Sequence, residues 1–205
     1  MAQKSRKLTT AIIIIAILAI LGYYVYTTYL NAPLPSITNF EEGLNLLDNA
    51  LVENSLDIYV SPEKEMILAI SDTAFDSAVK KINSLKQSFK TNALKDFANI
   101  YLAIIEEYQL RKELMQGADS FDALSQKEKC SSLNKADDVY KTQQELVTKY
   151  KANAALITDF SEKYPEEFEK TKLSQKTFSE EELKLFTQEL YSMQKAVAEE
   201  KQKCE

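Results

Sequence analysis

An uncharged apolar run near the start of the chain is long enough to cross a lipid bilayer. Residues 8–30 include no charged side chain. A helix of this length spans roughly 34 Å at about 1.5 Å per residue, which exceeds the thickness of a bilayer core. A helix of this composition buried in a soluble core would need a much larger protein around it. The run therefore predicts a transmembrane signal-anchor helix.

The charges on either side of this run predict its orientation. Basic residues precede it within residues 1–7, and the next basic residue after it is Lys64. Cytoplasmic flanks of membrane helices carry an excess of Lys and Arg, and tyrosines gather at the membrane interfaces. We therefore expect a single-pass protein of the cytoplasmic membrane, with the N-terminus inside and the C-terminal domain outside. The expected membrane-interface residues are Lys4, Arg6, Lys7, Tyr23, Tyr24, Tyr26 and Tyr29.

A cleaved signal peptide and a pilin-type leader are the alternatives. The apolar run is longer than the usual signal-peptide core of about 7–15 residues, and its nearest small-residue cleavage site ends at Ala32, directly before Pro33. A pilin-type leader would place a glutamate just inside the run, and none is present there. The sequence favours an uncleaved anchor, followed by a short Pro-containing spacer at residues 31–37.

Turn-forming residues are scarce throughout the chain. Only three glycines and four prolines occur in 205 residues. β-Sandwiches and barrels need tight turns every 8–12 residues or so, and Gly and Pro usually supply them. From Thr38 onward, apolar residues recur instead at helical spacing. Residues 38–205 are therefore predicted to form one all-α extracytoplasmic domain.

The first three helices of this domain have recognisable boundaries. Thr38 and Glu41 have the spacing of a capping box for the first helix. Ser61-Pro62-Glu63 has the pattern of a second start, after which one apolar stripe continues to Phe89. Gly117 is placed to end the third helix in the left-handed conformation.

Two further helices complete the prediction. The fourth starts at Ser120 or restarts near Ser131-Ser132, and its apolar seam has a polar step at Gln143. The fifth begins with a capping box at residues 179–182, and its apolar residues follow the 3-4-3-4 spacing of helices packed side by side. The five starts do not follow the 34-residue period of tetratricopeptide repeats. We therefore expect an antiparallel bundle of about five helices, with an irregular tetratricopeptide-like α-solenoid as the alternative.

Cys130 and Cys204 are the only cysteines, and both lie in the predicted extracytoplasmic domain. An oxidising compartment favours disulfides, and antiparallel packing of the last two long helices would bring the two residues to the same level. We expect an intramolecular bond, with an intermolecular bond and free buried thiols as alternatives. Closing a loop of about 74 residues stabilises a fold by about 4 kcal/mol in the chain-entropy model. The spacing is not Cys-x-x-Cys, so the expected role is structural.

The absence of histidine limits the chemistry available to this chain. Ser-His-Asp and Cys-His nucleophile systems, most zinc sites and the usual di-iron motif of helical bundles all need an imidazole. Adjacent carboxylates such as Glu106 and Glu107 point about 100° apart on a helix, so each such pair predicts a solvated face. Three scattered glycines do not make a phosphate-binding loop. No catalytic residue, cofactor or metal ion is predicted.

The charge balance narrows the range of partners. Beyond residue 31 the chain has 22 basic and 31 acidic residues, which gives a net charge of −9. A negative field of this size disfavours nucleic acid. The expected partners are the bilayer, through residues 8–30, and a protein at the cell envelope, so a membrane-anchored interaction or scaffold protein is the leading expectation. The alternative is a ligand-sensing or solute-binding bundle that acts through a membrane partner and holds a small molecule by tyrosines on its helix seams, namely Tyr101, Tyr108, Tyr140 and Tyr150.

Overall fold

The computed structural model describes residues 36–56, 64–175 and 180–204. The predicted anchor and its interface residues, the start at Ser61-Pro62-Glu63 and the capping box at Ser179 lie outside the described residues, and they stay predictions. Among the residues that are described, no helix is long and apolar enough to cross a membrane. The described residues belong to one compact unit.

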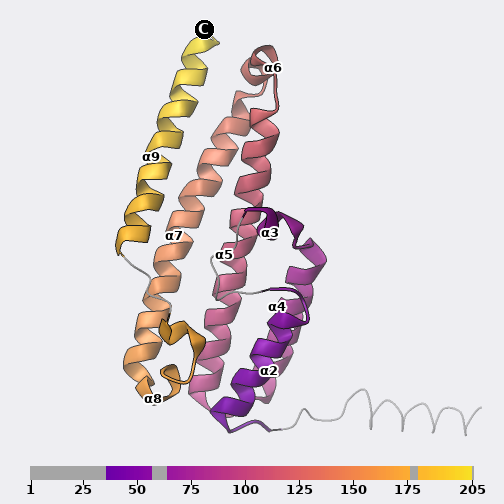
Figure 1. Cartoon of the computed structure of the whole chain (residues 1–205), viewed down its shortest axis with the longest axis vertical. Coiled ribbons are helices and arrows are strands. Elements are labelled where there is room, and N and C mark those ends of the chain that lie inside the picture. The colour runs from indigo at the N-terminus through magenta and orange to yellow at the C-terminus, as the bar shows by residue number, and fades with distance from the viewer. Residues whose placement is uncertain (1–35, 57–63, 176–179, 205) are drawn as a thin grey trace, which may run out of the picture. The chain divides into compact units, whose positions relative to one another are not determined.

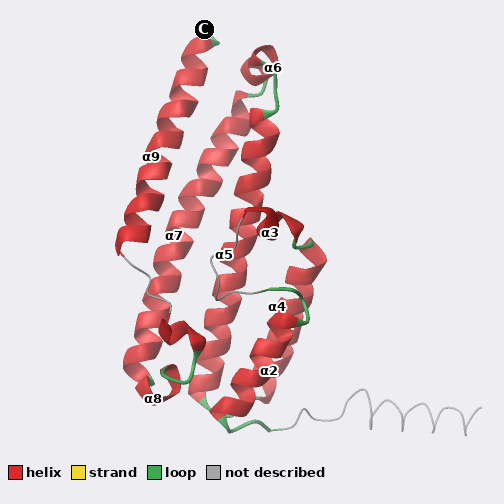
Figure 2. Cartoon of the chain, viewed as in Figure 1, coloured by secondary structure: helices red, strands yellow, loops and turns green. Residues whose placement is uncertain are grey.

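The described parts of the chain are helical, and their only pairing of the strand type is a single bridge between Ile37 and Phe89 (Figure 2). This confirms the predicted all-α class. The helices, in chain order, are α2 (Phe40–Val52), α3 (Lys64–Ala69), α4 (Asp72–Ser88), α5 (Asn92–Asp122), α6 (Gln126–Ser131), α7 (Leu133–Lys163), α8 (Pro165–Phe168), the 3-10 helix η2 (Lys172–Gln175) and α9 (Glu180–Lys203).

Three long helices, α5, α7 and α9, lie side by side, and each runs opposite to its neighbour (Figure 1). α7 lies between the other two and contacts both. The short α6 stands at the turn between α5 and α7, close to the C-terminal end of α9. α2 and α4 pack against each other and against α5. The result is a helical bundle, as the sequence predicted.

The hydrophobic core is concentrated at the end of the bundle that holds α2, α4 and the first half of α5. On α5 the buried apolar residues lie within 93–108. Phe97 is central to this core, with ring centroids 5.8 Å from Phe40 of α2 and 5.2 Å from Phe160 of α7, and such aromatic pairs add to the stabilisation by burial. Leu173 of η2 is fully buried in the same cluster. The part of α5 beyond residues 93–108 therefore contributes none of the residues of this apolar core.

The helical domain begins slightly differently from the prediction. Asn39, rather than Thr38, caps α2, because its side chain accepts a hydrogen bond of 3.0 Å from the backbone N–H of Glu42. Asn is at least as good an N-cap as Thr, since its carboxamide oxygen accepts from the same backbone N–H groups. Ile37, the last residue of the predicted spacer, is buried and pairs with the backbone at Phe89. It belongs to the core and not to a spacer.

The predicted second helix is two helices in the structure. Ser71 begins α4, and its hydroxyl accepts a hydrogen bond of 3.1 Å from the backbone N–H of Ala74. Because this cap interrupts the helix, the residues on either side do not share one stripe. Ile67 and Phe75 are buried, whereas Met66, which the single stripe placed in the core, is exposed.

Gly117 does not end the third helix, contrary to the prediction. It lies within α5 in a right-handed conformation, and the helix continues to Asp122. A Cβ atom at this position would lie 3.0 Å from a methyl group of Val139 on α7. The glycine thus permits a close approach of two helices instead of a left-handed turn. The restart that the sequence left open is at Leu133, where α7 begins after the separate α6.

Candidate functional site

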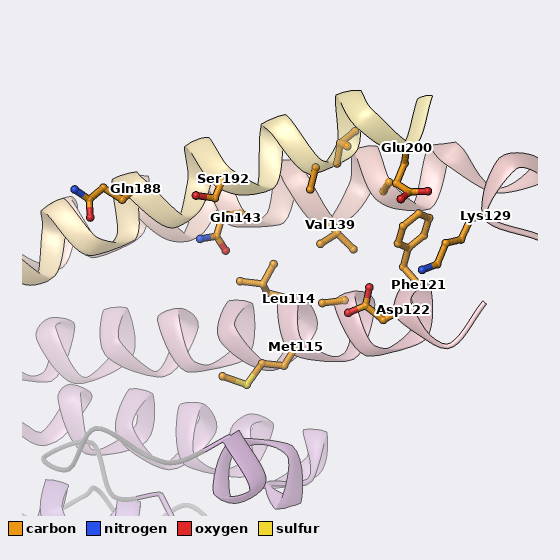
Figure 3. Close-up of a pocket in the computed structure, with 14 residues that line it drawn as sticks. Leu114, Met115, Phe121, Asp122, Lys129, Val139, Gln143, Gln188, Ser192 and Glu200 are labelled. Atoms are coloured by element: carbon orange, nitrogen blue, oxygen red, sulfur yellow. The ribbon is translucent and has the colours of Figure 1, made fainter. Parts of the chain in front are cut away.

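A cavity of about 740 Å³ lies between the second half of α5, α7 and α9 (Figure 3). This volume is within the range of about 300–1,000 Å³ that small-molecule sites occupy. Its apolar walls are formed by Leu114, Met115, Ala118, Phe121, Ala136, Val139, Ala196 and Val197.

Small side chains account for the space between these helices. Each of the three helices contributes an alanine to the cavity wall: Ala118 from α5, Ala136 from α7 and Ala196 from α9. α9 packs on α7 and on α6, so its position is set from that side. With methyl groups at these places, the gap between α9 and α5 is left unfilled by the described side chains.

The predicted disulfide closes one end of this region. Cys130 of α6 and Cys204, which directly follows α9, are bonded, with their Cα atoms 5.3 Å apart and a sequence separation of 74. The bond is intramolecular, which confirms the pairing that the sequence favoured. It joins the C-terminal end of α9 covalently to the turn between α5 and α7.

Polar contacts hold the same end of α9. Glu200 accepts hydrogen bonds from Nζ of Lys203, at 2.7 Å, and from Nε2 of Gln126 on α6, at 3.1 Å. These bonds, led by that from Lys203, lower the pKa of Glu200 because they stabilise its ionised form. Lys201 binds both carboxylate oxygens of Asp137 on α7, at 3.0 and 3.1 Å. The last turns of α9 are therefore fixed to two other helices.

The polar residues of the cavity are divided between its two ends (Figure 3). Uncharged groups gather at one end, namely Gln143, Gln188 and Ser192. Charged groups gather at the other end, next to α6, namely Asp122, Lys129 and Glu200. At that end Nζ of Lys129 lies 5.4 Å from the centre of the Phe121 ring, within the range of a cation–π contact. Leu114 and Val139 lie between the two ends.

Gln143 is the most unusual residue of the site. Its side chain is 2% exposed, and its Oε1 atom accepts no hydrogen bond within the described part of the chain. Figure 3 shows its carboxamide directed into the space between α9 and α5. Nearly all buried polar groups in proteins are hydrogen-bonded, so an unpaired buried oxygen that lines a cavity is a candidate contact for a ligand. The polar step in the apolar seam was the sequence signal for this residue.

The seam tyrosines do not form the ligand cage that the sequence suggested. None of the four is among the described residues that line the cavity. Tyr101, Tyr108 and Tyr150 are buried in the packing between helices. Tyr140 accepts a hydrogen bond of 2.9 Å from the side chain of Gln144, on the same helix. These rings serve packing because the helix faces that carry them meet other helices.

One carboxylate pair also departs from the prediction of a solvated face. Glu106 is exposed and forms an ion pair with Lys149, but Glu107 is 4% exposed and lies between α5 and α7. Arg111, one turn later on α5, donates two hydrogen bonds to Glu107 and so compensates its buried charge. Among the residues that the structure describes, no group of three or more Cys, Asp or Glu side chains is arranged to hold a metal ion.

The chain matches no protein-family model, and comparisons with curated proteins and with solved structures likewise found no match. The geometry and chemistry of the cavity are therefore the basis for a functional assignment.

Proposed function

We propose that this chain is a membrane-anchored, non-catalytic binding protein whose helical domain holds a small and mostly apolar molecule outside the cytoplasmic membrane. The observation that supports this proposal is the cavity of about 740 Å³ between α5, α7 and α9, which combines apolar walls with a few polar groups. Small-molecule sites have these features. Because of this cavity, we favour ligand binding over the scaffold function that the sequence favoured.

The walls supply the affinity in this proposal. A ligand that buries about 200 Å² of apolar surface gains about 5 kcal/mol at 25 cal/mol per Å². The predicted anchor at residues 8–30 would hold the cavity near the membrane surface, where apolar molecules concentrate. With only residues 1–7 predicted on the inside, any signal would pass through a membrane partner.

Thermal unfolding of the full-length protein in detergent tests the proposal. Pools of small molecules extracted from the native cells are added one by one. A ligand present at 100 times its Kd stabilises the folded state by about 2.7 kcal/mol, which raises Tm by roughly 5–10 °C for a domain of this size.

The variant Ala196→Trp provides the control, because Ala196 lines the cavity and an indole there would obstruct part of it. Ala198→Trp is the matched variant, since Ala198 is exposed on the same helix and is not among the lining residues. The expected ligand stabilises the wild type and Ala198→Trp but not Ala196→Trp. The proposal fails if no pool raises Tm, or if Ala196→Trp responds as the wild type does.

A protein partner at the envelope is the second candidate, and one observation favours it. Tyr191 of α9 is 71% exposed, and tyrosine is among the residues enriched at the energetic centres of protein interfaces. The acidic domain would suit a basic partner. A photo-crosslinking amino acid at position 191, used in the native membrane, should capture one protein. The same amino acid at Lys170, which is exposed after α8, is the control.

A further inference from the structure

We infer that the ligand of this cavity is an uncharged amphiphile, an apolar body with an O–H or N–H group that donates a hydrogen bond to Oε1 of Gln143. This inference rests on the proposed function and specifies the chemistry of the molecule that is bound.

The first step concerns the atom that the fold leaves unpaired. Oε1 of Gln143 is a buried acceptor with no donor among the described residues. A leucine at this position would continue the apolar seam of α7 with no polar atom to satisfy. A glutamine there therefore destabilises the empty protein relative to an apolar residue, and a donor from a ligand would remove that penalty. The ligand group must be a donor because an amide oxygen only accepts.

The second step concerns charge. The neighbours of Gln143 at its end of the cavity are Gln188 and Ser192, and neither is ionisable. An ionised ligand group would lose its hydration there without meeting an opposite charge. The charged side chains of the cavity lie at the far end, beside α6. The polar group of the ligand is therefore neutral, as in an alcohol, a phenol or an amide.

The third step concerns the size of the occupant. A helix with its side chains is about 10–12 Å across, so a volume near 740 Å³ holds only about six residues of one. The disulfide and the contacts of Glu200 and Lys201 hold the C-terminal end of α9, which limits widening of the cavity at that end. A small molecule fits this space and a partner helix does not. Its apolar body would extend from Gln143 past Leu114 and Val139.

A matched pair of probes tests the inference. 2-Naphthol and 2-methoxynaphthalene are both uncharged at neutral pH and share one ring system, but only 2-naphthol has a donor. Their binding to the full-length protein in detergent micelles is measured by equilibrium dialysis. Uptake by micelles that contain the Ala196→Trp variant is subtracted as the background.

The expected Kd of the wild type is about five-fold lower for 2-naphthol than for 2-methoxynaphthalene, since one net hydrogen bond is gained. Gln143→Leu should abolish this preference while retaining binding of the methoxy compound. Gln143→Met, with a side chain of similar length, repeats the test with a second packing. Gln144→Leu is the matched control, because Gln144 is exposed on the same helix outside this cavity and should leave the preference unchanged.

Two results would contradict the inference, and they are distinguishable. Saturable binding of both probes with equal Kd, or a preference that survives in both Gln143 variants, overturns the role of Gln143 and leaves the proposed function standing. No saturable binding of either probe above the Ala196→Trp background overturns the inference and counts against the cavity as a binding site altogether.

Discussion

Asn153 of α7 donates a hydrogen bond of 2.8 Å to Oε2 of Glu107 on α5, where both side chains are almost completely buried. The Asn153 amide also donates to the backbone oxygen of Ala103, at 3.2 Å. Arg111 donates to the other carboxylate oxygen of Glu107, from Nε at 3.0 Å and from Nη2 at 2.8 Å. The two 31-residue helices are thus joined by a buried polar link.

The first prediction concerns this link. Asn153→Ala should lower the free energy of unfolding by about 1–3 kcal/mol, because a buried carboxylate oxygen loses its donor. Urea denaturation of the full-length protein in detergent, followed by circular dichroism, measures the change. Asn134→Ala, at an exposed position of α7, should stay within about 0.5 kcal/mol. Equal effects of the two substitutions would show that the link does not stabilise the fold.

The second prediction compares two glycines. A Cβ at Gly43 of α2 would lie 2.3 and 2.8 Å from the methyl groups of Leu94 on α5, so Gly43→Ala requires the buried Leu94 side chain or one of the two helices to move. We expect a loss of about 1–3 kcal/mol from overpacking. Gly117→Ala meets only one methyl group, at 3.0 Å, and gains up to about 1 kcal/mol of helix propensity. Thermal melts should therefore show a lower Tm for Gly43→Ala than for Gly117→Ala, and the reverse order would be contrary to this packing.

The third prediction concerns the disulfide. Cys204→Ser should lower the stability by about 4 kcal/mol in the chain-entropy model, because it opens a loop of 74 residues. Hydrogen exchange followed by mass spectrometry should show the loss of protection first in the last turns of α9, next to the removed bond. Cys130→Ser should have the same effect. If both variants retain the hydrogen-exchange protection of the wild type in α9, the polar contacts of α9 alone hold its C-terminal end.

The fourth prediction is a dependence on pH. The pKa of Glu200 is held below its ordinary value of 4.5 by the hydrogen bonds from Lys203 and Gln126. A carboxylate whose pKa is lower in the folded state stabilises that state above pH 4.5, and this stabilisation is lost as the pH falls through the folded-state pKa. Wild type should therefore melt at a higher temperature than Glu200→Gln at pH 7, and the difference should shrink as the pH is lowered from 4.5 to 3. Glu199→Gln, its exposed neighbour, should track the wild type at both values.

Much of the fold could be predicted because apolar spacing reflects burial directly. Leu47 and Leu51, on the first predicted stripe, are buried as expected. The boundaries of the helices were less predictable, because one residue type can occur at a position for several structural reasons. A glycine late in a helix is typical of a C-terminal cap, but at Gly117 the missing side chain serves the contact with α7 instead. Ser71 was overlooked because the apolar stripe continues across it.

The candidate site could be predicted only in part. Gln143 stood out as a polar residue on an apolar seam, and the structure confirms that it is buried. The cavity beside it depends on the distance between α9 and α5, which are separated in sequence by all of α7. Helical periodicity gives the face that each helix buries but not how closely two faces approach. Tyr101, for which a ligand cage was only the alternative to a place in the core, lies in the core.

The disulfide also determines how the domain would respond to mechanical tension. Residues 130–204 form a covalently closed ring that includes all of α7 and α9. A pull between the N-terminal and C-terminal ends of the domain would run along residues 36–130 and then cross directly from Cys130 to Cys204. α2, α3, α4 and α5 lie on this path and would bear the load, while the backbone of α7 and α9 would be bypassed. Of the three helices that line the cavity, only α5 would then be pulled, and the other two would remain joined.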